Sequence, residues 1–201
     1  MNPLFGIPVG LALSAAAGLR VFVPLLLTGI AARLGALTLT PSMAWVGSDP
    51  ALVAFATATV LEVGAYYVPW LDNLLDAIAT PAAITAGVML TAAATPELSP
   101  FLRWALAIVA GGGAAGLVQA GTALLRLKSS AFTAGAGNPL IASAELAGSL
   151  ALSIAGLLAP LLAAVVAAAL LVFLASRLGR LRRERRRAVS RASLVGADPR
   201  A

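Results

Sequence analysis

IPVGLALSAAAGLRVFVPLLLTGIAA, residues 7–32, is long and apolar enough to cross a lipid bilayer, and it carries one charged side chain, Arg20, near its middle. A cation at the centre of a bilayer costs from about 2.5 to more than 10 kcal/mol, so it needs a partner or a polar cavity. We therefore expect the chain to lie in a membrane. We also expect this stretch to be a retained helix, since it lacks the basic start of a cleaved signal peptide.

The composition of the whole chain indicates the same environment. Sixty per cent of the 201 residues are hydrophobic, 11% are charged and the mean hydropathy is +0.96, whereas about a quarter of the residues in a soluble domain are charged. The uniformly apolar, Ala- and Leu-rich runs predict an all-α, polytopic transmembrane helical bundle. The chain has neither cysteine nor histidine, so we expect no disulfide and no zinc site of the ordinary type. A bound metal would need oxygen ligands, and we assign no metal site and no cofactor.

Proline, glycine and short polar breaks divide the apolar sequence into about six membrane segments. These are Ile7–Leu34, Pro50–Tyr67, Trp70–Thr95, Phe101–Leu127, Pro139–Leu158 and Pro160–Ser176. The last two could instead form one long kinked helix, because their 38 residues would span about 57 Å, which is too long for one ordinary crossing and short for two. Asp49-Pro50 and Asn138-Pro139 are similar helix starts, a pattern that allows two inverted three-helix halves.

The charges divide the chain into a nearly neutral body and a basic end. Nine arginines and two acids follow Ser176, which gives the end a net charge of +7, whereas the rest of the chain has −1. We therefore predict a transmembrane bundle, residues 1–176, and an Arg-rich cytoplasmic tail, residues 177–201, that is disordered beyond its first turns. Arg126 and Lys128 are predicted to form a short cytoplasmic loop, and both termini then lie in the cytoplasm.

The basic end favours contact with anionic lipid head groups over binding of nucleic acid, because it directly follows a membrane helix. The residues assigned to head-group contact are Arg177, Arg180, Arg182 and Arg183. Small residues at helical spacing predict close packing of helices within the bundle or between copies, so a homo-oligomer is compatible with the sequence. The assigned packing positions are Gly18, Gly112 and Gly116.

Polar side chains in or beside the apolar segments are candidates for an intramembrane site. Arg20 and Glu62 are plausible partners, and Glu145 is a further buried acid. The acidic stretch after Pro69 could gather oxygen atoms around a cation or a proton, or could be solvated beside an aromatic belt. The full set of polar-cavity or ion-binding candidates is Arg20, Glu62, Asp72, Asn73, Asp76, Asn138 and Glu145.

Three combinations of residues are specific enough to suggest a family. They are Gly18-Leu19-Arg20 with Pro24, Glu62 with Pro69 and Asp72, and Asn138-Pro139 with Glu145. With the apolar stretches around them they resemble the bacterial integral-membrane family catalogued as domain-of-unknown-function family 4126, over roughly residues 6–174. The resemblance implies a polytopic bacterial membrane protein and brings no activity with it.

The sequence favours a small transporter or channel-like protein of the bacterial inner membrane. In this interpretation the acids bind a cation or a proton, and Arg20 pairs with an acid or with an anionic solute. The alternative is a non-catalytic membrane scaffold or assembly factor whose basic tail recruits a lipid or a cytoplasmic partner. An enzyme is disfavoured, because the sequence shows no recognisable set of a nucleophile and a base that could activate it.

Overall fold

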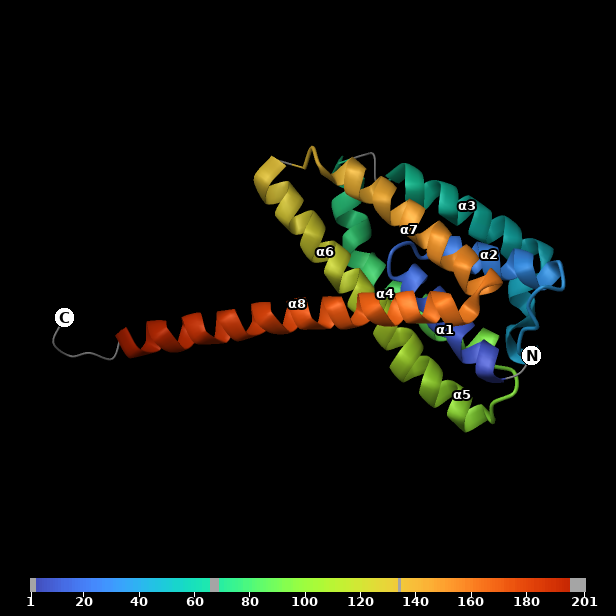
Figure 1. Cartoon of the computed structure of the whole chain (residues 1–201). Helices are drawn as coiled ribbons and strands as arrows, with labels where there is room; N and C mark the ends of the chain where they lie inside the picture. The colour runs from blue at the N-terminus through green and yellow to red at the C-terminus, as the bar shows by residue number, and fades with distance from the viewer. Residues whose placement is uncertain (1–2, 66–68, 134, 196–201) are drawn as a thin grey trace.

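The computed structural model is a bundle of helices (Figure 1). It describes the backbone of residues 3–65, 69–133 and 135–195, and the side chains of residues 5–65, 78–133 and 135–180. In chain order the elements are α1 (Pro3–Ala17), α2 (Phe22–Arg33), the 3-10 helix η1 (Pro41–Gly47), α3 (Asp49–Ala65), α4 (Pro69–Ala94), α5 (Pro100–Leu106), the π-helix η2 (Ala107–Gly112), α6 (Gly113–Thr133), α7 (Asn138–Leu158) and α8 (Pro160–Val195). The described ranges contain no strand, which confirms the predicted all-α fold.

The structure supports fewer membrane crossings than the six predicted. Three helical stretches among the described residues are long and apolar enough to cross, namely Pro100–Thr133, Asn138–Leu158 and Pro160–Arg180. A fourth is added if η1 and α3, which meet at a bend of 61°, form one broken span. The predicted division at Pro160 is confirmed, because α7 ends at Leu158 and Ala159 leaves the helical conformation before α8 begins.

The first predicted crossing, Ile7–Leu34, is wrong, because this stretch forms two short helices. Helix α1 has 15 residues and α2 has 12, and the chain leaves the helix between Ala17 and Phe22. Pro24 accounts for the break, since in a continuous helix its ring would clash with the carbonyl group of Arg20 four residues earlier. In the first turn of a new helix the same proline is well tolerated. Arg20 therefore lies in the break and not within a helix.

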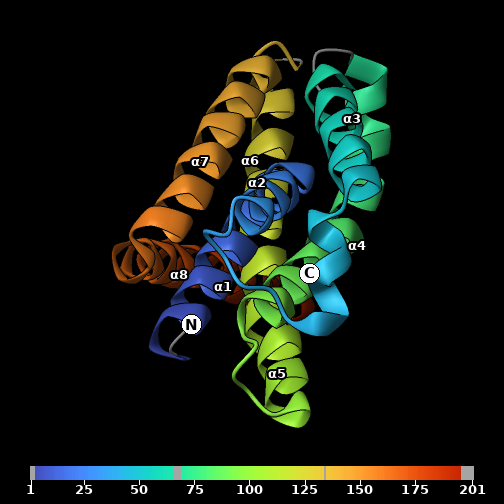
Figure 2. The ribbon, with the colours of Figure 1, turned by 90° about the vertical axis from the view of Figure 1, so that its right-hand side faces the viewer.

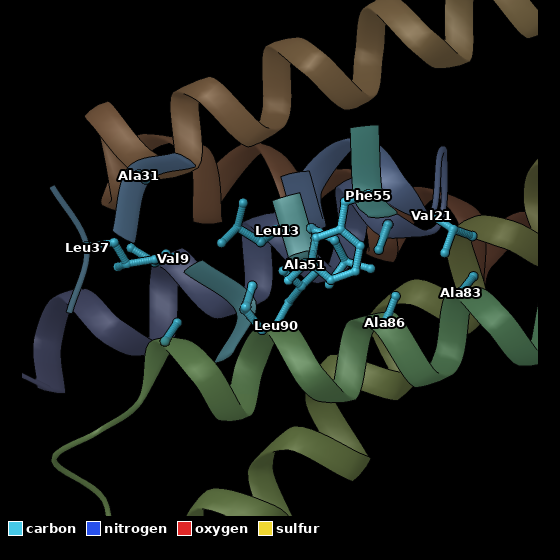
Figure 3. Packing of buried hydrophobic residues seen from close by; sticks show 14 residues of the cluster. Val9, Leu13, Val21, Ala31, Leu37, Ala51, Phe55, Ala83, Ala86 and Leu90 are labelled. Atoms are coloured by element: carbon cyan, nitrogen blue, oxygen red, sulfur yellow. The ribbon is translucent and has the colours of Figure 1, made fainter. Parts of the chain in front are cut away.

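Helices α1 and α2 double back on each other as a helical hairpin. Gly6, near the start of α1, packs against the backbone carbonyl of Ala94. Thr40, which follows α2, donates a backbone hydrogen bond of 3.1 Å to Ala93, so both ends of the hairpin meet the last turn of α4. Figure 3 shows Val9 beside Leu37 at one end of the core, whereas Val21 lies at the other end. The break that holds Arg20 is thus the inner tip of the hairpin.

Close helix packing surrounds this hairpin. Figure 2 shows α2 between α3 and α7, with α6 behind it. A β carbon at Gly18 would lie 2.5 Å from the carbonyl oxygen of Ala115, so only glycine allows α1 to approach α6 this closely. Gly112 and Gly116 both face Ile84 of α4, at 3.4 and 3.1 Å from where their β carbons would be. The assigned packing glycines therefore lie at helix contacts within one chain.

Helix α8 continues well beyond the predicted end of the bundle. It runs without a break from Pro160 to Val195, so the helix includes most of the basic end that was expected to be disordered beyond its first turns. Figure 1 shows this last part of α8 projecting away from the other helices. The basic end of the chain is therefore displayed on a helix that leaves the bundle.

Candidate functional site: a buried charge cluster

Arg20 occupies the tip of the hairpin and is buried, with 2% of its surface exposed. Its Nη2 atom donates a hydrogen bond of 2.7 Å to the carbonyl oxygen of Ala142. The same atom lies 3.6 Å from Oε2 of Glu145, so both contacts are with α7. The acid that the structure places against Arg20 is Glu145, and the break between α1 and α2 brings this cation to α7.

Arg126 is a second buried arginine on the same acid, and the sequence analysis missed it. Its Nε atom donates a hydrogen bond of 3.2 Å to Oε1 of Glu145, and its Nη2 atom donates to Oε2. Two parallel hydrogen bonds of this kind fix the guanidinium plane as well as its charge. The predicted cytoplasmic loop at Arg126 and Lys128 is wrong, because both residues lie inside α6, where Arg126 is buried and Lys128 is exposed.

Helical periodicity is the signal that could have found Arg126. Ala115, Gln119 and Arg126 are spaced by four and seven residues, which places them on one face of a helix. All three are buried in α6. Arg126 lies one residue before the predicted end of the segment at Leu127, so it resembles a flanking charge more than a member of this face.

Glu62 of α3 closes the other side of the tip. Its Oε1 atom accepts a hydrogen bond of 2.9 Å from the backbone N–H of Val21, and its Oε2 atom accepts one of 3.2 Å from the N–H of Phe22. These N–H groups begin α2 and have no partner inside the helix, so a carboxylate there satisfies them and matches the positive end of the helix dipole. Glu62 also lies near enough to Arg20 and Arg126 for their positive charges to attract its carboxylate.

Arg20, Glu62, Arg126 and Glu145 together form what we call the buried charge cluster. Their exposed fractions are 2, 8, 4 and 5%, and they come from the hairpin tip, α3, α6 and α7 respectively. Two positive and two negative charges balance, which lowers the cost of holding them away from water. Glu145 is the shared member, because both arginines lie against its carboxylate.

Hydrogen bonds between helices fix the position of the tip. The Ser149 hydroxyl of α7 donates a bond of 3.1 Å to the carbonyl oxygen of Ala16, in the last turn of α1. On the opposite side of α1, the Ser14 hydroxyl donates a bond of 2.7 Å to the carbonyl oxygen of Gly87 in α4. These two hydrogen bonds hold α1 between α4 and α7.

An apolar groove of about 490 Å³ lies between α2, α3 and α7. Its lining includes Val63 and Leu146, the residues that follow Glu62 and Glu145 in the chain. Most of the other wall residues are leucine or valine, a surface that suits hydrocarbon and not a hydrated ion. We therefore do not assign this groove to the path of an ion.

Of the remaining cavity candidates, Asn138 is the one whose side chain the structure describes. Asn138 begins α7, two turns before Glu145, and its Nδ2 atom donates a hydrogen bond of 3.1 Å to the Ser130 hydroxyl of α6. The backbone of Asp72, Asn73 and Asp76 belongs to α4, but their side chains lie outside the described residues, as do those of Arg182 and Arg183 in α8. Among the side chains that the structure does describe, no three acids gather as a metal ion would require.

Comparison with known proteins gave one match. A family model described as "Domain of unknown function (DUF4126)" matches residues 7–180. No curated protein and no solved structure matches the chain. The matched range contains all four residues of the buried charge cluster and ends at Arg180 in α8.

Proposed function

We propose that this chain, which belongs to the DUF4126 family by its match over residues 7–180, is a small membrane transporter or channel-like protein that moves an anion together with a proton. The observation that carries the proposal is the sharing of one carboxylate, Glu145, by two buried arginines from different parts of the chain. A second supporting observation is the hairpin of α1 and α2, which we propose to be re-entrant, since half-helices that meet inside a bundle are used by many transporters to build ion sites.

Charge balance in the cluster explains why the proton and the anion would move together. A proton added to Glu145 removes the negative charge that neutralises Arg20 and Arg126, and an excess positive charge is costly in a buried site. An anion that then binds the two guanidinium groups restores the original net charge. Binding of the proton therefore favours binding of the anion, and binding of the anion favours binding of the proton. Neither is bound favourably alone.

Flux through liposomes tests this function. The purified protein is reconstituted around a pH-sensitive dye, and inward gradients of chloride, nitrate, sulfate or phosphate are imposed in turn. We expect at least one anion gradient to acidify the interior through the wild-type protein. In the Glu145→Gln variant the amide cannot take up the proton, so acidification falls to the level of empty liposomes.

Glu97→Gln is the matched control for this flux measurement. It removes a carboxylate from the exposed connection between α4 and α5, outside the cluster, and should keep the wild-type flux. Equal proton uptake by the wild type and the Glu145→Gln variant would contradict the proposal. So would equal losses in the Glu145→Gln and Glu97→Gln variants.

The long helix α8 favours a membrane scaffold as the second candidate function. Its basic end continues as a helix to Val195 and projects from the bundle, where a partner could reach it (Figure 1). Removal of residues 177–201 separates the two candidates. A transporter keeps its flux after this deletion, whereas a scaffold loses its cellular function while its bundle remains stable.

A location in the bacterial cytoplasmic membrane is part of the proposal. The positive-inside rule places Lys128 and the basic end of α8 in the cytoplasm. In the proposed topology the hairpin does not cross, and the three stretches between Pro100 and Arg180 that are long enough to span cross three times. The start of α1, which lies beside the end of α4, is therefore placed on the face opposite the basic end. This revises the expectation that both termini are cytoplasmic.

A further inference from the structure

A groove of about 450 Å³ separates α6 from α8, on the part of the bundle from which α8 projects. The two helices touch where a β carbon at Gly121 would lie 2.7 Å from Leu174, and beyond this point they diverge (Figure 1). The inner walls of the groove are apolar and include Leu124, Leu125 and Phe173. The groove therefore opens as a wedge with a hydrocarbon-like interior.

Three cations complete the lining of this groove. Lys128 comes from α6, and Arg177 and Arg180 come from α8. The guanidinium group of Arg177 lies over the Phe173 ring, 5.1 Å from its centre, a contact that holds the charge at the edge of the apolar wall. The residues that line the groove include no acid to neutralise these charges.

We propose that the groove between α6 and α8 binds one anionic phospholipid. Its phosphate would lie among Lys128, Arg177 and Arg180, and an acyl chain would cover Leu124 and Leu125. A soluble phosphate compound would use only the cations and would leave the apolar walls uncovered, whereas a lipid matches both halves of the lining. The site shares no residue with the buried charge cluster, so it stands independently of the proposed transport.

Native mass spectrometry of the detergent-purified protein tests the site. The wild type is titrated with phosphatidylglycerol and, separately, with phosphatidylcholine of the same acyl chains. We expect one phosphatidylglycerol to be retained in clear preference to phosphatidylcholine. The Arg177→Gln, Arg180→Gln double variant should bind phosphatidylglycerol about tenfold or more weakly, because each basic side chain near a phosphate contributes to the attraction.

The double variant Arg186→Gln, Arg187→Gln is the matched control, because it removes the same charge from further along α8, and it should keep wild-type binding. Equal losses in the two double variants would overturn the site in favour of general attraction to a basic helix. A Leu125→Trp variant fills the apolar wall and should also weaken the lipid; unchanged binding would overturn the acyl-chain contact. Displacement of the lipid by millimolar glycerol phosphate would overturn the phospholipid site in favour of a site for soluble phosphate compounds.

Discussion

Replacing Glu145 with leucine should destabilise the bundle by about 3–5 kcal/mol, because it leaves two buried arginines without the carboxylate that they share. Arg126→Leu should cost less. In that variant Glu145 still faces Arg20, whose Nη2 atom lies 3.6 Å from its carboxylate. The expected order of thermal stability in detergent is therefore wild type, then Arg126→Leu, then Glu145→Leu.

Lys128→Leu provides the control for this series. Lys128 lies in the same helix as Arg126, two residues further on, but its side chain is exposed. Changes at exposed positions usually alter stability by about 0.5 kcal/mol or less. If Glu145→Leu unfolded at the same temperature as Lys128→Leu, the cluster would contribute nothing to the fold and the description of its pairing would be wrong.

Replacing Gly87 with leucine should have an effect of similar size for a different reason. A β carbon at Gly87 would lie 2.6 Å from the carbonyl oxygen of Gly111, so the added side chain would meet backbone that cannot move aside. The carbonyl oxygen of Gly87 also accepts the hydrogen bond from Ser14. A displacement of α4 that relieves this clash would also strain the hydrogen bond from Ser14, which holds α1 against α4. We expect a loss of about 3 kcal/mol, the upper end of the usual cost of overpacking.

Gly113→Leu is the matched control for this prediction. Gly113 begins α6, directly after the π-helix, and a β carbon there would meet no atom within 4 Å. The added leucine has open space and a better helix propensity than glycine, so stability should be unchanged or slightly raised. Equal losses of stability at the two glycines would show that helix crossing at Gly87 is not as tight as described.

The later part of the fold could be predicted from the sequence because hydropathy and proline report on it directly. Two long apolar runs on either side of Pro160 give two helices, and Pro160 cannot continue the first of them. The first apolar run was misread for an equally physical reason. Its length and composition are the same whether it crosses the membrane or doubles back. Only the position of Pro24, four residues after Arg20, distinguishes the two.

The acids of the candidate site could be predicted from the sequence, but the arginines that pair with them could be predicted only in part. An acid in an apolar segment is conspicuous, and Glu62 and Glu145 were found for this reason. Which cation meets which acid depends on how helices distant in the chain pack together, and the sequence pattern does not contain that information. Arg126 and Glu145 are separated by 19 residues and a turn, and they meet only because α6 and α7 return alongside each other.

The re-entrant hairpin is the feature on which the cluster and its proposed function depend, and thiol labelling measures it directly. The chain has no cysteine, so Phe5→Cys and Ala36→Cys variants each place a single thiol at one end of the hairpin. A membrane-impermeant maleimide is applied from one side of oriented vesicles, with a cysteine added after residue 201 as the reference for the opposite face. We predict that both hairpin thiols react from the same side, and that the reference reacts from the other. Labelling of Phe5→Cys and Ala36→Cys from opposite sides would show that the stretch crosses the membrane, and would contradict the account.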